Sequence, residues 1–63
     1  MKLYIWRDVL RDYTSGIAFC MAHSLGEAFA VMKANMADYE FAELNGDPEV
    51  HDEPFGAHIW GGG

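Results

Sequence analysis

The sequence predicts a small α+β domain: a single β-β-α-β-β unit with a mostly antiparallel sheet and one helix packed on one face. Three observations lead to this fold class. Two apolar segments near the start flank a turn signal, a capped segment with helical spacing follows, and turn-forming residues separate two further short segments. At 63 residues the chain has the size of one domain with a lean core. We expect that domain to span residues 1–60 and residues 61–63 to form a flexible glycine tail.

Residues 2–10 and 17–22 are predicted to pair as a β-hairpin. Between them, residues 12–16 supply turn chemistry, and Gly16 is free to take a positive φ. Both faces of the first segment are largely apolar, so we expect this strand to lie inside the sheet. One face holds Leu3, Ile5, Arg7 and Val9, and the other holds Tyr4, Trp6, Asp8 and Leu10.

A helix is predicted over residues 25–37. Ser24 and Glu27 have the spacing of a capping box, in which each side chain bonds to the backbone of the other residue. The segment that follows carries apolar side chains at helical spacing, which predicts one buried stripe. The members of this stripe are Leu25, Ala28, Phe29, Met32 and Met36.

The remainder of the chain is predicted to complete the sheet. Residues 39–44 form a third strand with its aromatic side chains inward, and residues 45–48 have the composition of a turn. Residues 49–54 are either an irregular acidic segment or an edge strand, because Pro54 cannot donate to a ladder. Residues 56–60 predict a final short strand.

The predicted architecture leaves one face of the sheet uncovered. Aromatic surface on such a face favours self-association or a protein partner. Small domains usually gain stability from disulfides, a metal or a second subunit. Cys20 is the only cysteine, so an internal disulfide is excluded. We therefore expect a homodimer.

The charge of the chain is strongly asymmetric. Residues 1–37 carry four basic and three acidic side chains, whereas residues 38–63 carry seven carboxylates and no lysine or arginine, giving a formal net charge of −6. A surface of one sign repels nucleic acid and attracts basic surfaces, so we expect a basic protein partner and no direct nucleic-acid contact. The carboxylates are Asp38, Glu40, Glu43, Asp47, Glu49, Asp52 and Glu53.

No segment predicts insertion into a membrane. The longest uninterrupted apolar run is residues 17–22, against the roughly 20 residues that cross a bilayer. Charges at Arg7 and Asp8 interrupt the start of the chain before a signal-peptide hydrophobic region can form. We expect a cytoplasmic protein, which fits its single cysteine.

The chemistry-bearing residues do not predict a cofactor or an enzyme. Cys20-x-x-His23 superficially suits zinc, with His51 and His58 as further ligands. A strand over residues 17–22 would point Cys20 away from His23, however, so we expect no metal and no other cofactor. A thiol in the middle of an apolar run is usually inert, and Ser24 is explained as a helix cap. We therefore expect no catalytic residue.

The predicted partner-binding site consists of the seven carboxylates and two aromatic anchors, Phe55 and Trp60. Two plainer interpretations stay open. The carboxylates could serve only to keep a hydrophobic small protein soluble. The two rings could belong to the core, as most large rings in so small a fold must.

The layout of the whole chain resembles the small accessory proteins of bacteriophages and prophages. Its elements are an opening Met1-Lys2-Leu3-Tyr4-Ile5-Trp6 strand, a hairpin, a His23-Ser24-Leu25-Gly26-Glu27-Ala28 junction, and an Asp52-Glu53-Pro54 approach to Ala57-His58-Ile59-Trp60. Phage proteins of this size include inhibitors of host defence systems, among them acidic anti-CRISPR proteins. The resemblance implies a protein that binds and inhibits a host defence protein in the host cytoplasm. It assigns no role to any single residue.

The chain is also similar to ubiquitin-like sulfur carriers of the β-grasp type. The shared features are the β-β-α-β-β order, the length, a turn like Asn45-Gly46-Asp47 and the terminal Gly62-Gly63. In that family the terminal glycine carboxylate is adenylated and then thiolated, which implies a sulfur carrier as the alternative function. The chain departs from the family pattern at Trp60, directly before a third glycine, and in its longer acidic segment at residues 49–53.

Overall fold

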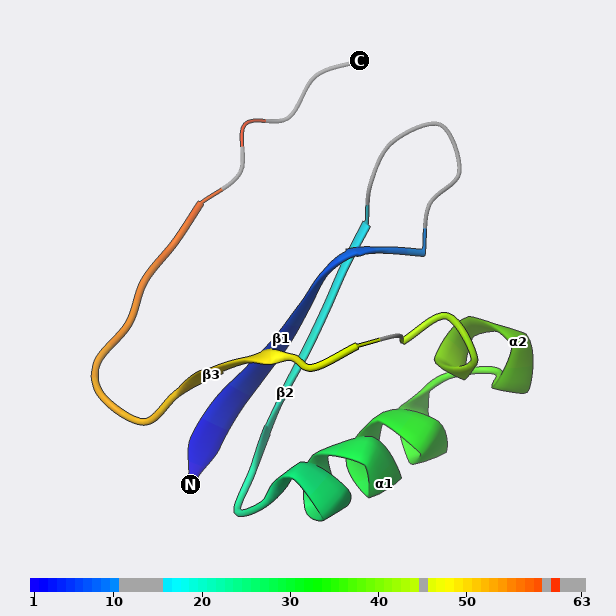
Figure 1. The fold of residues 1–63 in the computed structure, drawn as a ribbon, viewed down its shortest axis with the longest axis horizontal. Coiled ribbons are helices and arrows are strands. Elements are labelled where there is room, and N and C mark those ends of the chain that lie inside the picture. The colour runs from blue at the N-terminus through cyan, green and yellow to red at the C-terminus, as the bar shows by residue number, and fades with distance from the viewer. Residues whose placement is uncertain (11–15, 45, 59, 61–63) are drawn as a thin grey trace.

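The chain folds as a three-stranded antiparallel sheet with one main helix packed against it (Figure 1). The computed structural model describes residues 1–10, 16–44, 46–58 and 60. The sheet has the order β2-β1-β3, so β1 is the central strand, as its two apolar faces predicted. In chain order the elements of the described residues are β1 (Lys2–Val9), β2 (Gly16–Ala22), α1 (Leu25–Asn35), α2 (Asp38–Phe41) and β3 (Glu49–His51).

The predicted hairpin is confirmed. β1 and β2 pair antiparallel from Lys2 opposite Ala22 to Arg7 opposite Ile17. Burial alternates along β2, and its small side chains lie beneath α1. Cys20 is one of these, and its thiol donates a hydrogen bond to the backbone oxygen of Ala28 in α1 at 3.7 Å. The other face of β2 carries no helix.

An irregularity near the end of β1 changes one predicted orientation. Asp8 has a φ of 57°, and the pairing register shifts between Arg7 and Val9. A bulge inserts one residue into the alternation, so the next side chain turns to the other face. Val9 consequently joins Trp6 in the buried core, rather than sharing a face with Arg7 as predicted.

Helix α1 begins where the capping residues predicted. Ser24 Oγ accepts a hydrogen bond from the Glu27 backbone N–H at 3.1 Å. The Glu27 carboxylate reaches one residue further back than a capping box requires, because it accepts the His23 N–H at 2.9 Å. The helix ends at Asn35, two residues earlier than predicted, since Met36 is already extended.

The predicted stripe of α1 covers the sheet in part. Ala28 and Met32 are buried, Phe29 and Met36 pack against the core, and Leu25 is exposed. The rings of Trp6 and Phe29 lie 5.5 Å apart between their centroids and join the helix to the sheet. Aromatic contacts of this kind supply much of the packing in a small core.

The strand predicted over residues 39–44 is wrong. The segment begins with the short helix α2, in which Phe41 N–H donates to the Ala37 carbonyl at 2.9 Å. Ala37 N–H in turn donates to Glu40 Oε1 at 3.0 Å, so the acid closes the first turn. Tyr39 is consequently 75% exposed instead of facing inward, whereas Leu44 reaches the core.

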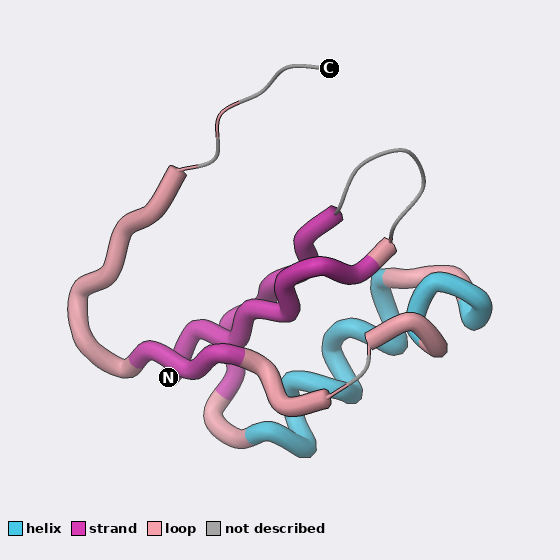
Figure 2. The backbone as a smooth tube through the Cα atoms, turned by 45° about the horizontal axis from the view of Figure 1, so that its top comes forward, coloured by secondary structure: helices cyan, strands magenta, loops and turns pink. Residues whose placement is uncertain are grey.

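Among its described residues, the last part of the chain contains one strand rather than two. β3 is an edge strand, one of the two alternatives for residues 49–54, and it pairs with β1 through three residues. The strand predicted at 56–60 is absent from residues 56–58 and 60. After Pro54 the chain runs away from the sheet, and the element order is β-β-α-α-β (Figures 1 and 2). Of the turn predicted at 12–16, only Gly16 is described; it begins β2 and does not have a positive φ. Residues 12–15 of that turn and the glycine tail at 61–63 lie outside the described residues.

The described helices are short. None of them has both the length and the apolar character needed to cross a membrane.

Candidate functional site

One face of the sheet carries apolar side chains, and none of the helices in the described part of the chain lies over it. We call it the open face and define it by the side chains of β1 and β2 that point away from α1. Phe19 is 64% exposed and Met21 is 58% exposed. The open face consists of Leu3, Ile5, Arg7, Ile17, Phe19 and Met21.

A pocket lies at one end of the open face. The sheet register places Leu3 of β1 opposite Met21 of β2 on one side and opposite His51 of β3 on the other. These three side chains therefore share one face and one level of the sheet. The chain after β3 folds around them and completes a pocket of about 370 Å³. Its lining is Met1, Leu3, Met21, His51, Asp52, Glu53, Pro54 and Phe55.

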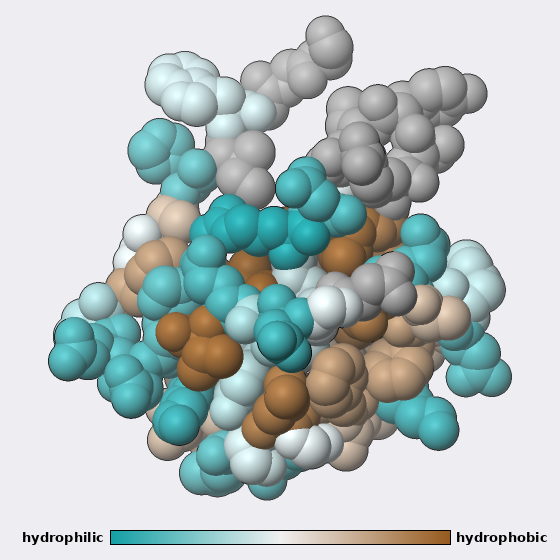
Figure 3. All heavy atoms as spheres, viewed as in Figure 1, coloured by the Kyte–Doolittle hydropathy of each residue, from teal (hydrophilic) through white to brown (hydrophobic). Residues whose placement is uncertain are grey.

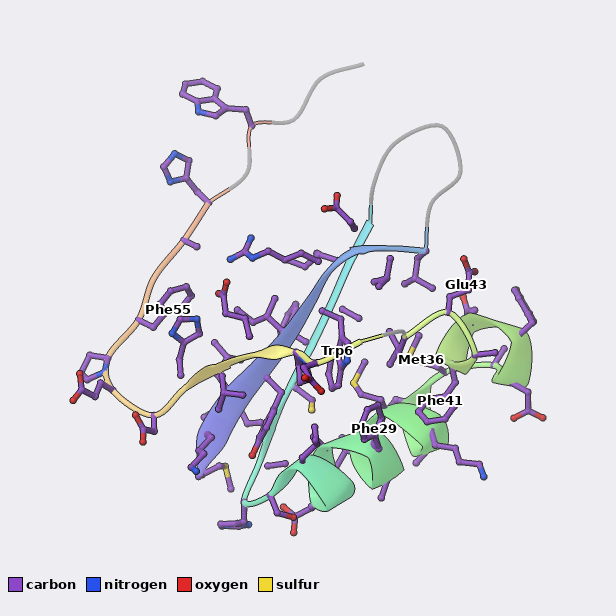
Figure 4. The ribbon with its side chains drawn as sticks, viewed as in Figure 1. Trp6, Phe29, Met36, Phe41, Glu43 and Phe55 are labelled. Carbon is purple, nitrogen blue, oxygen red and sulfur yellow. The ribbon has the colours of Figure 1, made fainter. Side chains whose placement is uncertain are left out.

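The aromatic wall of the pocket is built by two stacked rings. The His51 and Phe55 rings lie 3.6 Å apart between their centroids and are inclined by 19°. This contact holds the segment after β3 close to the strand, and Pro54, which lines the same pocket, directly precedes Phe55 (labelled in Figure 4). Asp52 and Glu53 are in the same bend, so the pocket combines an apolar floor with two carboxylates.

Glu49 is already engaged within the protein. Arg7 Nε and Nη2 donate to its two carboxylate oxygens at 3.3 and 3.2 Å, and His51 Nε2 lies 2.6 Å from Oε2. The hydrogen bond from Arg7, and then that from His51, lowers the pKa of Glu49 below its ordinary value. Its charge is thus largely compensated by Arg7.

The structure separates the predicted partner-binding residues into groups. Asp52, Glu53 and Phe55 come together at the pocket. The carboxylates of α2 and the turn after it lie at the opposite end of the molecule, as the labelled Glu43 and Phe55 show in Figure 4. On the side seen in Figure 3, apolar side chains lie between the hydrophilic ones. The distant group consists of Asp38, Glu40 and Glu43, with Asp47 in the connection to β3.

Trp60, the second predicted anchor, does not line the pocket. Its side chain is 88% exposed, and its ring meets His58 edge-on at 6.2 Å. The pocket residues that were not predicted from the sequence are Met1, Leu3, Met21, His51 and Pro54. The signal was present in the hairpin, because an antiparallel register that aligns residues 2 and 22 also aligns Leu3 with Met21.

The groups considered for metal binding and nucleophilic chemistry have structural roles. Burial raises the pKa of the Cys20 thiol, which favours the unreactive protonated form. His23 Nδ1 lies 3.0 Å from Glu27 Oε1 on the exposed surface. That carboxyl has a lowered pKa, chiefly because the His23 backbone N–H donates to it. No cluster of three or more His, Cys, Asp or Glu side chains suited to a metal occurs in the described ranges.

This site is therefore a pocket on a sheet face with three parts. Leu3 and Met21 form its apolar floor, the His51 and Phe55 rings form its aromatic wall, and Asp52 and Glu53 form its acidic rim. Such a surface can bind a side chain that is apolar along its length and positive at its tip. Comparison with known proteins finds no family model, no curated protein and no solved structure that matches the chain.

Proposed function

We propose that this protein binds a basic segment of another protein, and that the pocket receives a lysine or arginine side chain of that segment. The observation that supports this is the position of Asp52 and Glu53 beside the apolar floor formed by Leu3 and Met21. The carboxylate of β3, Glu49, is by contrast engaged by Arg7. The function we propose is binding.

The chemistry of the pocket favours a long cationic side chain. Lysine and arginine bury an aliphatic stem against apolar surface while their charged end stays in water. In this pocket the stem would lie on Leu3 and Met21, and the charge would lie between Phe55 and the two carboxylates. A cation over an aromatic ring gains roughly 0.5–1 kcal/mol at an exposed site, in addition to its attraction to the carboxylates.

The remaining carboxylates would act at longer range. A chain with a formal net charge of −6 attracts a basic surface before contact, which raises the rate of association more than the final affinity. Many basic protein surfaces hold nucleic acid, so occupying one of them would block it. This is the mechanism by which the protein would inhibit a host defence protein, the partner that the likeness to phage accessory proteins implies.

The sulfur-carrier alternative gains no support from the fold. That likeness depended on a β-β-α-β-β order, whereas the described elements follow the order β-β-α-α-β. Its other main feature, Gly62-Gly63, lies outside the described residues. We therefore do not carry it further.

The four methionine methyl groups provide a direct test. Two, those of Met1 and Met21, line the pocket, whereas Met32 is buried under α1 and Met36 packs against the core. The probe is a short peptide with one arginine between leucines, titrated into protein labelled with ¹³C at the methionine methyls. We expect the Met1 and Met21 signals to shift and saturate while those of Met32 and Met36 stay in place. A peptide with norleucine in place of arginine should shift them far less.

A pair of matched variants then tests the acidic rim. Asp52→Asn with Glu53→Gln should weaken binding of the arginine peptide by about tenfold, since close charges matter at physiological salt, where the screening length is about 8 Å. Asp38→Asn with Asp47→Asn makes the same change in net charge away from the pocket and should have little effect. Equal loss in both double variants would mean attraction by net charge alone, and the pocket proposal would be wrong.

A further inference from the structure

On the open face the apolar side chains of β2 are exposed, whereas Ile5 of the central strand is buried, and no described helix covers them. Phe19 is the middle residue of β2 and pairs with Ile5 near the middle of β1. Ile17 and Met21 flank it on the same face and are also exposed. A sheet with a helix on one side only, in a chain of 63 residues, leaves part of its second face exposed, here the side chains of β2. Exposed apolar surface of this kind marks an interaction site.

The charge of this face distinguishes it from the rest of the protein. The ionised side chain that β1 and β2 contribute to it is Arg7, which is bonded at two points to Glu49, the residue of β3 that pairs with Ile5. The face is therefore close to neutral in a chain whose formal net charge is −6. A basic partner is attracted to carboxylates, and Asp52 and Glu53 lie in the pocket at one end of this face rather than around Phe19. An identical neutral face meets it without bringing uncompensated like charges together.

We infer that the open face packs against the open face of a second copy, forming a two-fold symmetric dimer centred on Phe19. Helix α1 lies on the other side of β2 and does not obstruct this approach. Two sheets packed in this way lie about 10 Å apart and interdigitate their side chains. The contact is self-complementary, as a two-fold interface requires. The pocket is at the end of the open face where Met21 meets Leu3, so the dimer carries two pockets at its rim.

The size of the face sets the expected strength of the dimer. β1 has eight residues, so the paired strands extend over roughly 25 Å, and three strands span about 15 Å. This gives a few hundred Å² of contact area per copy, which is smaller than the roughly 800 Å² of an ordinary stable interface. We therefore expect a dimer that dissociates in the micromolar range.

Sedimentation equilibrium tests this inference. Over protein concentrations from about 10 µM to about 1 mM, the weight-average mass should rise from one chain of 7.1 kDa toward twice that value. Phe19→Lys should remain monomeric across the range. Tyr39→Lys, an equivalent change at an exposed ring on α2, should associate like the original protein. Far-UV circular dichroism checks that each variant is folded. If Phe19→Lys unfolds, Phe19→Thr replaces it, because threonine is a strand-forming residue.

The salt dependence of dimerisation and the contacts between labelled and unlabelled chains test the same interface in two further ways. Raising the salt concentration should leave dimerisation unchanged or strengthen it. Salt screens the repulsion between two acidic copies but does not weaken their apolar contact. In a mixture of labelled and unlabelled chains, intermolecular nuclear Overhauser effects should reach the Met21 methyl and not that of Met32. A protein that stays monomeric at about 1 mM, a Phe19→Lys variant that still associates, or contacts at Met32 would overturn the inference. Arginine-peptide binding retained by Phe19→Lys would show that the pocket functions independently of the dimer.

Discussion

Arg7 on the central strand and Glu49 on the last strand form a two-point ion pair across the sheet, with nitrogen–oxygen distances of 3.3 and 3.2 Å. Glu49 pairs in register with Ile5, so Arg7 is its diagonal neighbour two residues along β1. β3 has only three residues in the ladder, too few to hold an edge strand firmly by backbone bonds alone. The ion pair therefore helps to fix β3, and with it the bend that carries the acidic rim of the pocket.

The contribution of this ion pair should depend on pH. The pKa of Glu49 is lowered by Arg7 and His51 in the folded protein, so its stabilising contribution is present above the ordinary carboxyl value near 4.3 and is lost as pH falls below it. Glu49→Gln should therefore lower the melting temperature at pH 7, and the difference from the original protein should disappear toward about pH 2–3. Thermal unfolding followed by circular dichroism across this range measures it. Glu53→Gln, which also removes one carboxylate but lies outside this ion pair, is the control and should lower the melting temperature at pH 7 by less.

The N-cap of α1 should make a measurable contribution to the free energy of unfolding. Ser24 Oγ accepts the Glu27 N–H at the start of the helix, and Ser24→Ala leaves that donor without its partner. We expect a loss of about 1 kcal/mol in the free energy of unfolding, the usual cost of removing an N-cap. Urea denaturation measures it. Ser24→Asp restores a side-chain acceptor and should recover most of the loss; no recovery would mean that the hydroxyl acts in some other way.

The parts of the fold that could be predicted are those determined by neighbouring residues. The hairpin follows from two apolar segments around a turn signal, and the start of α1 follows from Ser24 and Glu27. The strand prediction at residues 39–44 was wrong because the local sequence gives an ambiguous signal for a helix. Glu40 closes the first turn of α2 by accepting the Ala37 N–H, yet Ala37 offers no side-chain cap, so the segment lacks the usual signature of a helix start.

The candidate site could be predicted only in part, because contacts between distant segments create it. Asp52, Glu53 and Phe55 were among the predicted binding residues, since charge and aromatic character are properties of single positions. The apolar floor arises from the register of β1 with both neighbours, which aligns Leu3 with Met21 and His51. Charge counted along the sequence also could not show that α2 would carry its carboxylates to the far end of the molecule (Figure 4).

Two glycines should respond with opposite sign to the same substitution. Gly46 has a φ of 72°, so Gly46→Ala forces a side chain into the left-handed region and should destabilise the protein by about 1–2 kcal/mol. No atom lies within 4 Å of the added carbon, so this cost is one of backbone conformation. Gly26 lies in α1 with equally open space around it, and Gly26→Ala should stabilise the protein by about 0.5–1 kcal/mol. Urea midpoints compare the two, and a shift of the same sign in both would contradict the assignment.

The packing of α1 on β2 leaves no room for a larger side chain at Ala28. This residue is fully buried, and the Cys20 thiol of β2 donates to its carbonyl. Ala28→Leu should therefore push the helix away from the sheet and destabilise the protein by about 1–3 kcal/mol, a large fraction of what so small a core supplies. Ala30→Leu makes the same change on the exposed side of α1 and should alter the stability by about 0.5 kcal/mol or less. Urea denaturation measures both variants. If Ala28→Leu were as stable as the original protein, the helix would have to lie further from β2 than the Cys20–Ala28 contact places it.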